Sequence, residues 1–363
     1  MNSLHIKSSE LLSVVNLVAP IVKDKTSLPI LSNLLFEAND GKLKITASNG
    51  EIRASISIDV DFKHEFYFCV SKNVLVNILS SLPNIDIIIS IEKSKISISS
   101  SFGVYDLPTE DSLLYPKQED MEELTSFNVD ADQFIDGLKK AVPFVDVLTE
   151  NLNRVVIKSE NKKLNIAGLS NSCFYEKQFD YNGDDISISL TTDCARYLSQ
   201  VIDVDSELSI NYNKTFFCVY FEGMSIISTQ LASNPPNYQR IFDVLQKKNT
   251  LTIDRELFLS CVKRFSAISD KDSKSFILNL SGDKMSISYK NNLLNHTANE
   301  EVKEFKYVGT EISIGLNINK LKTILSTLEE DEAVVCLSTF DKPMLFEEQN
   351  TRILISPMIA DKN

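Results

Sequence analysis

Apolar and polar residues alternate along three similar segments of the chain. The first segment, FEANDGKLKIT at 36–46, alternates on both sides of an Asn-Asp-Gly turn, a pattern typical of a β-hairpin. The pattern returns as IKSENKKLNIA at 157–167 and as LNLSGDKMSIS at 278–288. Equivalent residues of successive hairpins are 121 positions apart: Leu43, Leu164 and Met285. This spacing predicts a threefold internal repeat of domain size.

Each repeat is also expected to carry two amphipathic helices. The first helix follows a short strand, within 4–22, 127–145 and 251–269, and in the second repeat Asp130 and Gln133 have capping-box spacing. The second helix has apolar residues at i, i+3, i+4 and i+7 and covers 71–82, 192–202 and 317–328. Two helices among many short, mostly antiparallel strands predict an α+β unit, repeated three times.

The domain organisation follows from the repeat. A chain of 363 residues is long enough for two or three cores. The repeat predicts three domains, at 1–124, 125–247 and 248–363. The acidic, proline-containing stretch 108–124 is interpreted as the linker before the second domain.

Composition indicates an ordinary globular protein in the cytoplasm. The chain is 43% hydrophobic, and neither a signal peptide nor a membrane span is recognisable. The six cysteines lie far apart without a CxxC pair, so we expect reduced, buried thiols rather than disulfides or a metal site. They are Cys69, Cys173, Cys194, Cys218, Cys261 and Cys336.

Catalytic motifs are missing from the sequence. The glycines form neither GxGxxG nor a P-loop, and the three histidines stand in unrelated contexts. No histidine lies beside a candidate nucleophile, and HExxH is absent. We therefore expect a protein that is not an enzyme and that needs no cofactor or metal.

The positive charges are concentrated on the predicted helices. The net charge is −13, yet the six helical windows hold nine basic and five acidic residues. Single basic residues on amphipathic helices are most often ordinary solvent-exposed positions. A positive bias inside an acidic protein nevertheless suggests that one helical face meets a polyanion.

Three segments resemble the bacterial sliding clamp family, the beta subunit of the replicative DNA polymerase. They are SLPILSNLLFEANDGKLKITASNGEI at 27–52, SNPPNYQRIF at 233–242 and ILISPM at 353–358. Together with the threefold repeat, the resemblance covers essentially the whole chain. It implies a head-to-tail homodimeric ring whose twelve helices line the hole and whose sheets form the outside.

The resemblance implies a non-catalytic processivity factor that encircles duplex DNA without sequence preference. Its implied partners are double-stranded DNA, the catalytic subunit of the replicative polymerase, an ATP-driven clamp loader and other proteins with clamp-binding motifs. A closed ring cannot fall off sideways, so weak attraction to phosphates is sufficient and leaves sliding nearly free of barriers. The implied inner, DNA-facing residues are Lys25, Lys72, Lys139, Lys140, Arg196, Lys263, Arg264, Lys320 and Lys322.

The resemblance also implies an apolar groove that takes a short linear motif of partner proteins. Its lining would be Leu152, Leu169, Cys173, Phe174, Pro236, Arg240, Ile241, Leu354, Pro357, Met358 and Ile359. For Leu152 and Leu354, a plain core role is an equally fair interpretation. The chain has LSNSCF at 169–174 where the family usually has Thr-Asp-Gly-His-Arg-Leu, and it ends in IADKN after Met358. We therefore expect a shifted peptide preference.

Ring closure would join the end of the first domain to the start of the third domain of a second chain. The implied interface residues are Phe102, Val104, Ala267, Ile268, Lys93, Lys95, Glu300, Glu301 and Glu304. We expect the apolar contacts to dominate, because exposed ion pairs contribute under about 1 kcal/mol each.

Two other classes of function are alternatives to the clamp. One is a β-rich three-domain scaffold or adhesion protein without a role on nucleic acid, and unpaired cysteines with no export signal argue against it. The other is a hydrolase or isomerase that uses scattered acidic residues, and no motif supports it.

Overall fold

A computed structural model describes the chain over residues 2–62, 64–92, 94–235, 237–245, 247–270 and 274–358. The chain divides into two compact units. Unit 1 holds Met1–Ile135 and Arg196–Ala232, and unit 2 holds Asp136–Ala195 and Ser233–Asn363. Residues 125–247 contribute to both units, so the division into three domains stays a prediction.

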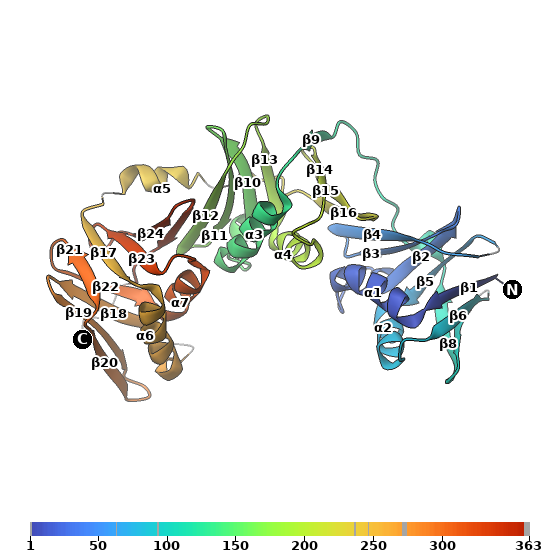
Figure 1. Ribbon diagram of the computed structural model, residues 1–363, viewed down its shortest axis with the longest axis horizontal. Helices are drawn as coiled ribbons and strands as arrows, with labels where there is room; N and C mark the ends of the chain where they lie inside the picture. Colours follow the sequence, from blue (N-terminus) through green and yellow to red (C-terminus); the bar gives the residue numbers. More distant parts are fainter. Residues whose placement is uncertain are drawn as a thin grey trace. The chain divides into compact units, whose positions relative to one another are not determined.

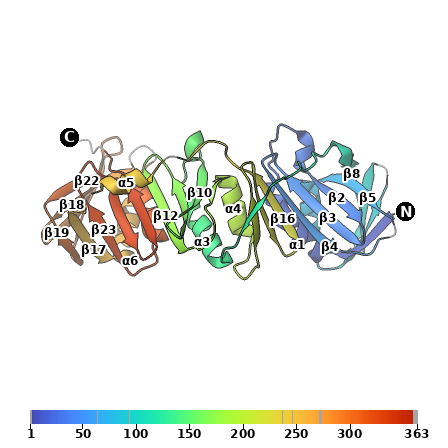
Figure 2. The ribbon, with the colours of Figure 1, turned by 90° about the horizontal axis from the view of Figure 1, so that it is seen from above.

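Unit 1 is built on a twelve-stranded sheet (Figures 1 and 2). Its order is β1 (Asn2–Lys7), β6 (Asp86–Ile91), β7 (Lys95–Ser100), β8 (Gly103–Glu110), β5 (Phe66–Ser71), β2 (Asn33–Asn39), β3 (Lys42–Ser48), β4 (Ile52–Asp59), β16 (Met224–Thr229), β15 (Phe216–Phe221), β14 (Ser209–Tyr212) and β9 (Thr125–Phe127). The antiparallel pairing of β4 with β16 joins strands of the first and second repeats.

Unit 2 contains a nine-stranded and a four-stranded sheet. The nine-stranded order is β13 (Ser187–Thr191), β10 (Arg154–Glu160), β11 (Lys163–Leu169), β12 (Cys173–Asp180), β25 (Thr351–Ile355), β24 (Met344–Glu348), β23 (Glu332–Leu337), β17 (Asn249–Asp254) and β21 (Phe305–Val308). The four-stranded order is β20 (His296–Val302), β19 (Lys284–Asn291), β18 (Ser275–Ser281) and β22 (Ile312–Asn317). Antiparallel pairing of β12 with β25 joins the second and third repeats.

The predicted helices are present with ends close to those expected. They are α1 (Ser8–Val18), α2 (Lys72–Ser81), α3 (Ala131–Ala141), α4 (Thr192–Val201), α6 (Arg255–Ile268) and α7 (Ile318–Thr327). The Asp130 carboxylate accepts a hydrogen bond from the Gln133 backbone N–H at 3.0 Å, which confirms the predicted helix cap. Helices α1 and α2 pack together in unit 1, and α6 and α7 pack together in unit 2.

Shorter helical elements connect the main ones. Helix α5 (Gln239–Val244) is not predicted by the hydrophobic pattern, and short 3₁₀ helices cover Ala19–Ile21, Pro29–Ser32, Ser112–Leu114, Val142–Phe144 and Glu150–Leu152. None of the helices among the described residues is long and apolar enough to cross a membrane.

The three hairpins occupy equivalent positions in the fold. Leu43, Leu164 and Met285 each lie second in a strand and are at most 1% exposed. Each hairpin turns over two residues, and Asp40 and Gly41 of the first both have positive φ, as a type I′ turn requires. The repeat predicted from sequence spacing is therefore present in the fold.

The stretch 108–124 is not a free linker along its whole length. Its first residues belong to β8, and Tyr115 is buried in a small apolar cluster with Leu31, Leu35 and Cys69. All six cysteines are free and buried, as the sequence analysis predicted.

Candidate functional site

An apolar row crosses the nine-stranded sheet of unit 2. Cross-strand neighbours Phe174 and Leu354 lie at its centre, with Leu169 opposite Phe174 and Leu345 opposite Leu354. These four residues are 2–5% exposed and belong to one cluster that also includes Val156, Ala167, Tyr238 and Cys336. Next to Phe174 in sequence, Tyr175 points to the other face, where its ring stacks on Phe144 at 5.2 Å.

Helix α5 lies over this row, on the face of the sheet opposite to α7 (Figure 1). The Tyr238 ring is 4.6 Å from the Phe174 ring, and the Phe242 ring is 5.4 Å from it in an edge-on arrangement. Such pairs stabilise a contact beyond the area that they bury. The cluster therefore has a floor of sheet residues and one wall formed by the α5 segment.

The structure brings several of the predicted groove residues together. Leu152, Leu169, Phe174 and Leu354 share the cluster, and Leu152 is only partly buried. On α5, Arg240 is exposed and Ile241 is 38% exposed. Such partly exposed apolar residues above a buried floor suit the anchoring of a peptide side chain. Pro236 and Ile359 lie outside the described residues.

The C-terminal segment runs from the floor of the groove toward the smaller sheet. The Ser356 backbone N–H donates to the Ser172 carbonyl, and the Met358 N–H donates to the Gly315 carbonyl of β22, both at 2.8 Å. Pro357 is half-buried, whereas Met358 is 40% exposed. The described tail thus presents a flexible thioether side chain to solvent.

A polar turn borders the groove where the family usually has His and Arg. The Ser170 hydroxyl accepts from the Cys173 N–H at 3.0 Å, and Asn171 donates to the Asp146 carboxylate at 3.0 Å. Burial raises the pKa of the Cys173 thiol to about 11, so this thiol stays neutral. The turn is therefore held by its own hydrogen bonds and supplies no fixed charge at Ser172 or Cys173.

Two arginines that the sequence analysis did not single out hold the α5 segment. Arg352 is paired with the buried carboxylate of Glu176, and its guanidinium carbon lies 3.9 Å from the centre of the Phe242 ring. Arg154, 1% exposed, donates to the Ser233 carbonyl and hydroxyl at 2.5 Å each. The sequence signal for either is slight: each arginine stands directly beside a run of apolar strand residues, VVI after Arg154 and ILI after Arg352.

The predicted DNA-facing residues are located mainly on exposed helical surfaces. Lys25, Lys139, Arg196, Lys263 and Arg264 are exposed, and the other four are half-buried: Lys72, Lys140, Lys320 and Lys322. Lys25, Lys72 and Arg196 belong to unit 1, and the other six belong to unit 2.

Acidic neighbours already contact some of these cations, including Lys72, Lys140 and Arg264. Lys72 lies 4.0 Å from Asp24, Arg264 is paired with Glu300, and Lys140 is paired with Asp136 at 3.0 Å and with Glu329. Burial alone would raise the pKa of Asp136, but hydrogen bonds from Lys177 and Lys140 outweigh it and lower that pKa. The positive charge available to a polyanion is consequently smaller than the sequence count suggested.

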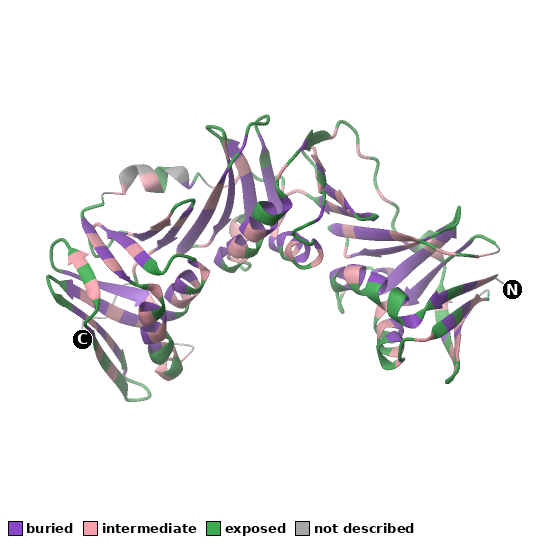
Figure 3. Ribbon diagram, in the orientation of Figure 1, coloured by how far each residue is buried: buried purple, intermediate pink, exposed green. Residues whose placement is uncertain are grey.

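Two strands among the described residues have an open edge beside predicted interface residues. Over residues 103–108, β8 pairs only with β7, and Phe102 and Val104 at its start are 67% and 64% exposed. In unit 2, β20 pairs only with β19 and is mostly exposed (Figure 3).

The other predicted interface residues lie near these edges or carry charges already paired within the chain. Ala267 is exposed and Ile268 is half-buried at the end of α6. Lys95 is paired with Asp106 at 2.9 Å, and Glu300 with Arg264. Glu301 lies on β20 and Glu304 follows it, while Lys93 lies outside the described residues.

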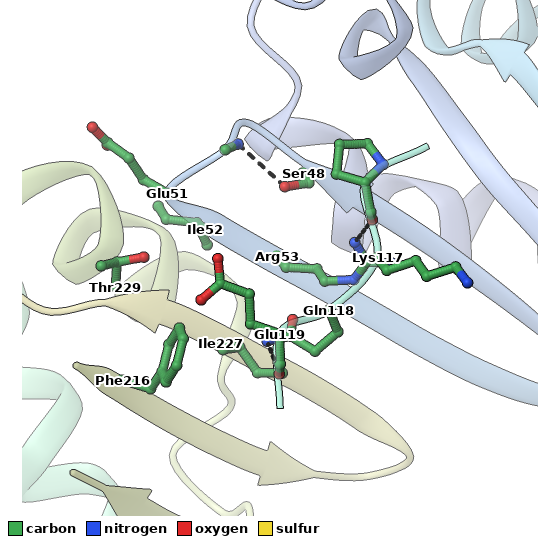
Figure 4. Close-up of a pocket in the computed structure, with 12 residues that line it drawn as sticks. Ser48, Glu51, Ile52, Arg53, Lys117, Gln118, Glu119, Phe216, Ile227 and Thr229 are labelled. Atoms are coloured by element: carbon green, nitrogen blue, oxygen red, sulfur yellow. Dashed lines mark hydrogen bonds between the residues drawn. The ribbon is translucent and has the colours of Figure 1, made fainter. Parts of the chain in front are cut away.

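Unit 1 has a polar pocket where β4 meets β16, shown in Figure 4. Its volume is about 140 Å³, and its lining includes Arg53, Ile227, Lys117 and Glu119. The Arg53 guanidinium donates to the Pro116 carbonyl at 2.6 Å and lies over the Tyr115 ring at 5.5 Å. The segment 116–119 therefore crosses the sheet as a polar cover.

Known proteins resemble this chain from end to end. The family profile of the DNA polymerase III beta subunit N-terminal domain matches residues 2–119, and that of its C-terminal domain matches residues 245–358. The beta sliding clamp of Rickettsia bellii is 21% identical, with 94% of each chain covered.

Solved structures of the same kind share the fold. The DNA polymerase III beta subunit of Pseudomonas aeruginosa has a TM-score of 0.91 at 20% identity, covering 98% of this chain and 99% of its own. The sliding clamp of Bartonella birtlesii, solved with bound griselimycin, has a TM-score of 0.91 at 18% identity, covering 99% of this chain and 100% of its own.

Proposed function

Because the chain belongs to the DNA polymerase III beta subunit family, we propose that it acts as a DNA sliding clamp. In this role it encircles duplex DNA and tethers the replicative polymerase to its template. The observation that carries the proposal is the match of family profiles to both ends of a chain whose repeats are joined by continuous sheets. The scaffold alternative has no comparable support.

Ring closure is proposed to occur between the open edges of β8 and β20 from two chains. Phe102 and Val104 supply exposed apolar surface at one edge, and Ala267 and Ile268 flank the other. Open edges of this kind invite strand pairing, and a closed head-to-tail dimer removes them. Since Lys95 and Glu300 already have partners within the chain, apolar burial is the main driving force.

An Ile268→Asp substitution tests ring closure. A carboxylate in the apolar contact must be desolvated, so the variant is expected to be a monomer of 40.8 kDa, whereas the native protein has twice that mass. Sedimentation equilibrium at nanomolar concentration measures the difference. An image of the native particle should show a central hole, and a compact particle without one would refute the ring.

DNA is proposed to pass through the ring against the helices. Lys139 and Lys263 are exposed, and no ion pair involves either one in the described part of the chain. Partial neutralisation of the remaining cations keeps the attraction to phosphate weak and sequence-independent. We propose that the protein catalyses nothing, works in the cytoplasm, and depends on an ATP-driven loader to be placed on DNA.

Partner proteins are proposed to dock in the groove of unit 2. The buried floor at Phe174 and Leu354, with Ile241 and Met358 exposed beside it, suits a short apolar motif from a polymerase, a loader subunit or another clamp-binding protein. Griselimycin, found with a related clamp, is proposed to occupy the same groove. It therefore serves as a defined probe of this site.

A further inference from the structure

The pair formed by Glu176 and Arg352 lies beneath α5. The two residues are directly opposite each other on β12 and β25, and Arg352 Nε donates to Glu176 Oε2 at 2.9 Å. The Glu176 side chain is fully buried, while that of Arg352 is 26% exposed. A buried carboxylate is costly to leave without its cation, so the pair acts as one unit.

Both aromatic residues of the α5 segment lie close to this pair. The Arg352 guanidinium lies over the Phe242 ring, with 3.9 Å between its carbon and the ring centre. The Tyr238 ring lies 4.6 Å from the ring of Phe174, which stands two residues before Glu176 on β12. Burial raises the pKa of the Tyr238 hydroxyl, and the charge of Glu176 raises that pKa further. The direct contact of the pair with the α5 segment is therefore that of Arg352 with Phe242.

Helix α5 cannot hold its own position. It has six residues, fewer than an isolated helix needs to be stable in water. Its placement therefore depends on contacts with the sheet, and the stacked guanidinium is a planar, partly desolvated contact of the strong kind. The exposed residues Arg240 and Ile241 are carried on the same six-residue helix.

We infer that Glu176 and Arg352 are positioning residues for the partner groove: they fix α5 against the sheet, and so fix the groove wall, without contacting the bound peptide. This inference rests on the proposed partner groove. The two side chains lie two residues along their strands from the Phe174–Leu354 pair, and therefore on the same face of the sheet, beneath Phe242.

The absence of tryptophan from the chain permits a direct reporter. Phe242→Trp gives a protein with one indole at the stacked position. In this background, Arg352→Met alone would leave the Glu176 carboxylate buried and unpaired. The test variant is therefore the double variant Glu176→Gln with Arg352→Met. The double variant leaves no buried charge. Lys163→Met is the matched control, because it removes the cation of an exposed pair, Lys163–Asp180, on β11 and β12 of the same sheet.

Two readouts are taken from each variant: indole emission with acrylamide quenching, and the Kd for griselimycin by calorimetry. In the double variant we expect red-shifted emission, stronger quenching and a Kd increased about tenfold. Arg352→Lys keeps the charge without the planar stack and should fall between the native protein and the double variant. The control should match the Phe242→Trp parent in both readouts.

Where the parent protein binds griselimycin, every other combination of the two readouts overturns the inference. Unchanged emission with a weakened Kd would mean that the pair acts on the ligand directly, and changed emission with an unchanged Kd would mean that α5 does not shape the site. Unchanged values in both would remove the positioning role entirely. If the Phe242→Trp parent and the native protein both fail to bind griselimycin, the proposed groove itself fails, while the emission data still decide whether the pair holds α5.

Discussion

The two junctions between repeats are formed by different strand pairs, β4 with β16 and β12 with β25, and the side chains at the two junctions differ in polarity. In unit 1, Arg53 of β4 lies opposite Ile227 of β16, and in unit 2, Phe174 of β12 lies opposite Leu354 of β25. Arg53 and Phe174 occupy equivalent positions in the repeat, because they are 121 residues apart and successive hairpins have the same spacing. One junction therefore has a guanidinium where the other has a phenyl ring.

The segments that cover the two junctions also differ in polarity: one is aromatic and the other is mainly polar. The unit 2 junction is covered by Tyr238 and Phe242 of the α5 segment, and the unit 1 junction by the polar stretch 116–119. An apolar floor with an aromatic wall can take an aliphatic or aromatic anchor, whereas a charged floor would have to be desolvated first. The repeat therefore supplies the position of a site, while single residues decide whether a peptide can bind there.

Phe174→Arg gives the unit 2 junction the side chain of the unit 1 junction. A guanidinium in a position that is 4% exposed would have to be desolvated, and the neighbouring Glu176 carboxylate is already paired with Arg352, so we expect griselimycin binding to weaken more than about 100-fold. Unit 2 should also lose several kcal/mol of unfolding free energy, about 3 or more. Calorimetry and thermal unfolding measure the two effects. Retention of native affinity would disprove the role of the apolar floor.

Met358→Ala removes an exposed side chain without disturbing that floor. The loss of its contact area with a bound anchor is expected to weaken binding about tenfold, with little change in Tm. The probe is a fluorescein-labelled peptide carrying the clamp-binding segment of the replicative polymerase, titrated by anisotropy. Equal affinities of the variant and native proteins would exclude Met358 from the groove.

Arg53→Met alters the unit 1 junction alone. It removes the hydrogen bond to the Pro116 carbonyl and should lower the unfolding free energy by about 1 kcal/mol, leaving griselimycin affinity within about twofold of native. Thermal unfolding and calorimetry check both values. A large loss of affinity would show that the two junctions do not act independently.

Local patterns predicted the elements well. The hairpins and the helices at 71–82, 192–202 and 317–328 can be predicted because their patterns involve residues that are close together in sequence. Both ends of α2, α4 and α7 lie within one residue of the predicted limits. The sequence pattern places Tyr115 in a linker. Its burial could not be predicted from nearby residues, because it arises from contact with Leu31 and Leu35, which are far away in sequence.

The candidate site was predictable only in part. The resemblance named Phe174 and Leu354, but the Glu176–Arg352 pair depends on the register between strands 176 positions apart, which no local pattern reveals. The sequence suggests that all the helical cations are available to a polyanion, yet Lys140 and Arg264 have acidic partners on other parts of the fold. Pairing of side chains across the fold is therefore the part that the sequence alone does not determine.

As a sliding clamp, the protein is proposed to hold DNA by enclosing it. The most direct test loads the labelled protein onto nicked circular DNA with its loader and ATP, isolates the complex, and then cuts the circle once with a restriction enzyme. A clamp should stay on the circle at moderate salt and leave within minutes of the cut, because it slides off the free ends. Retention on the linear product, or equal loss from uncut circles, would contradict the account.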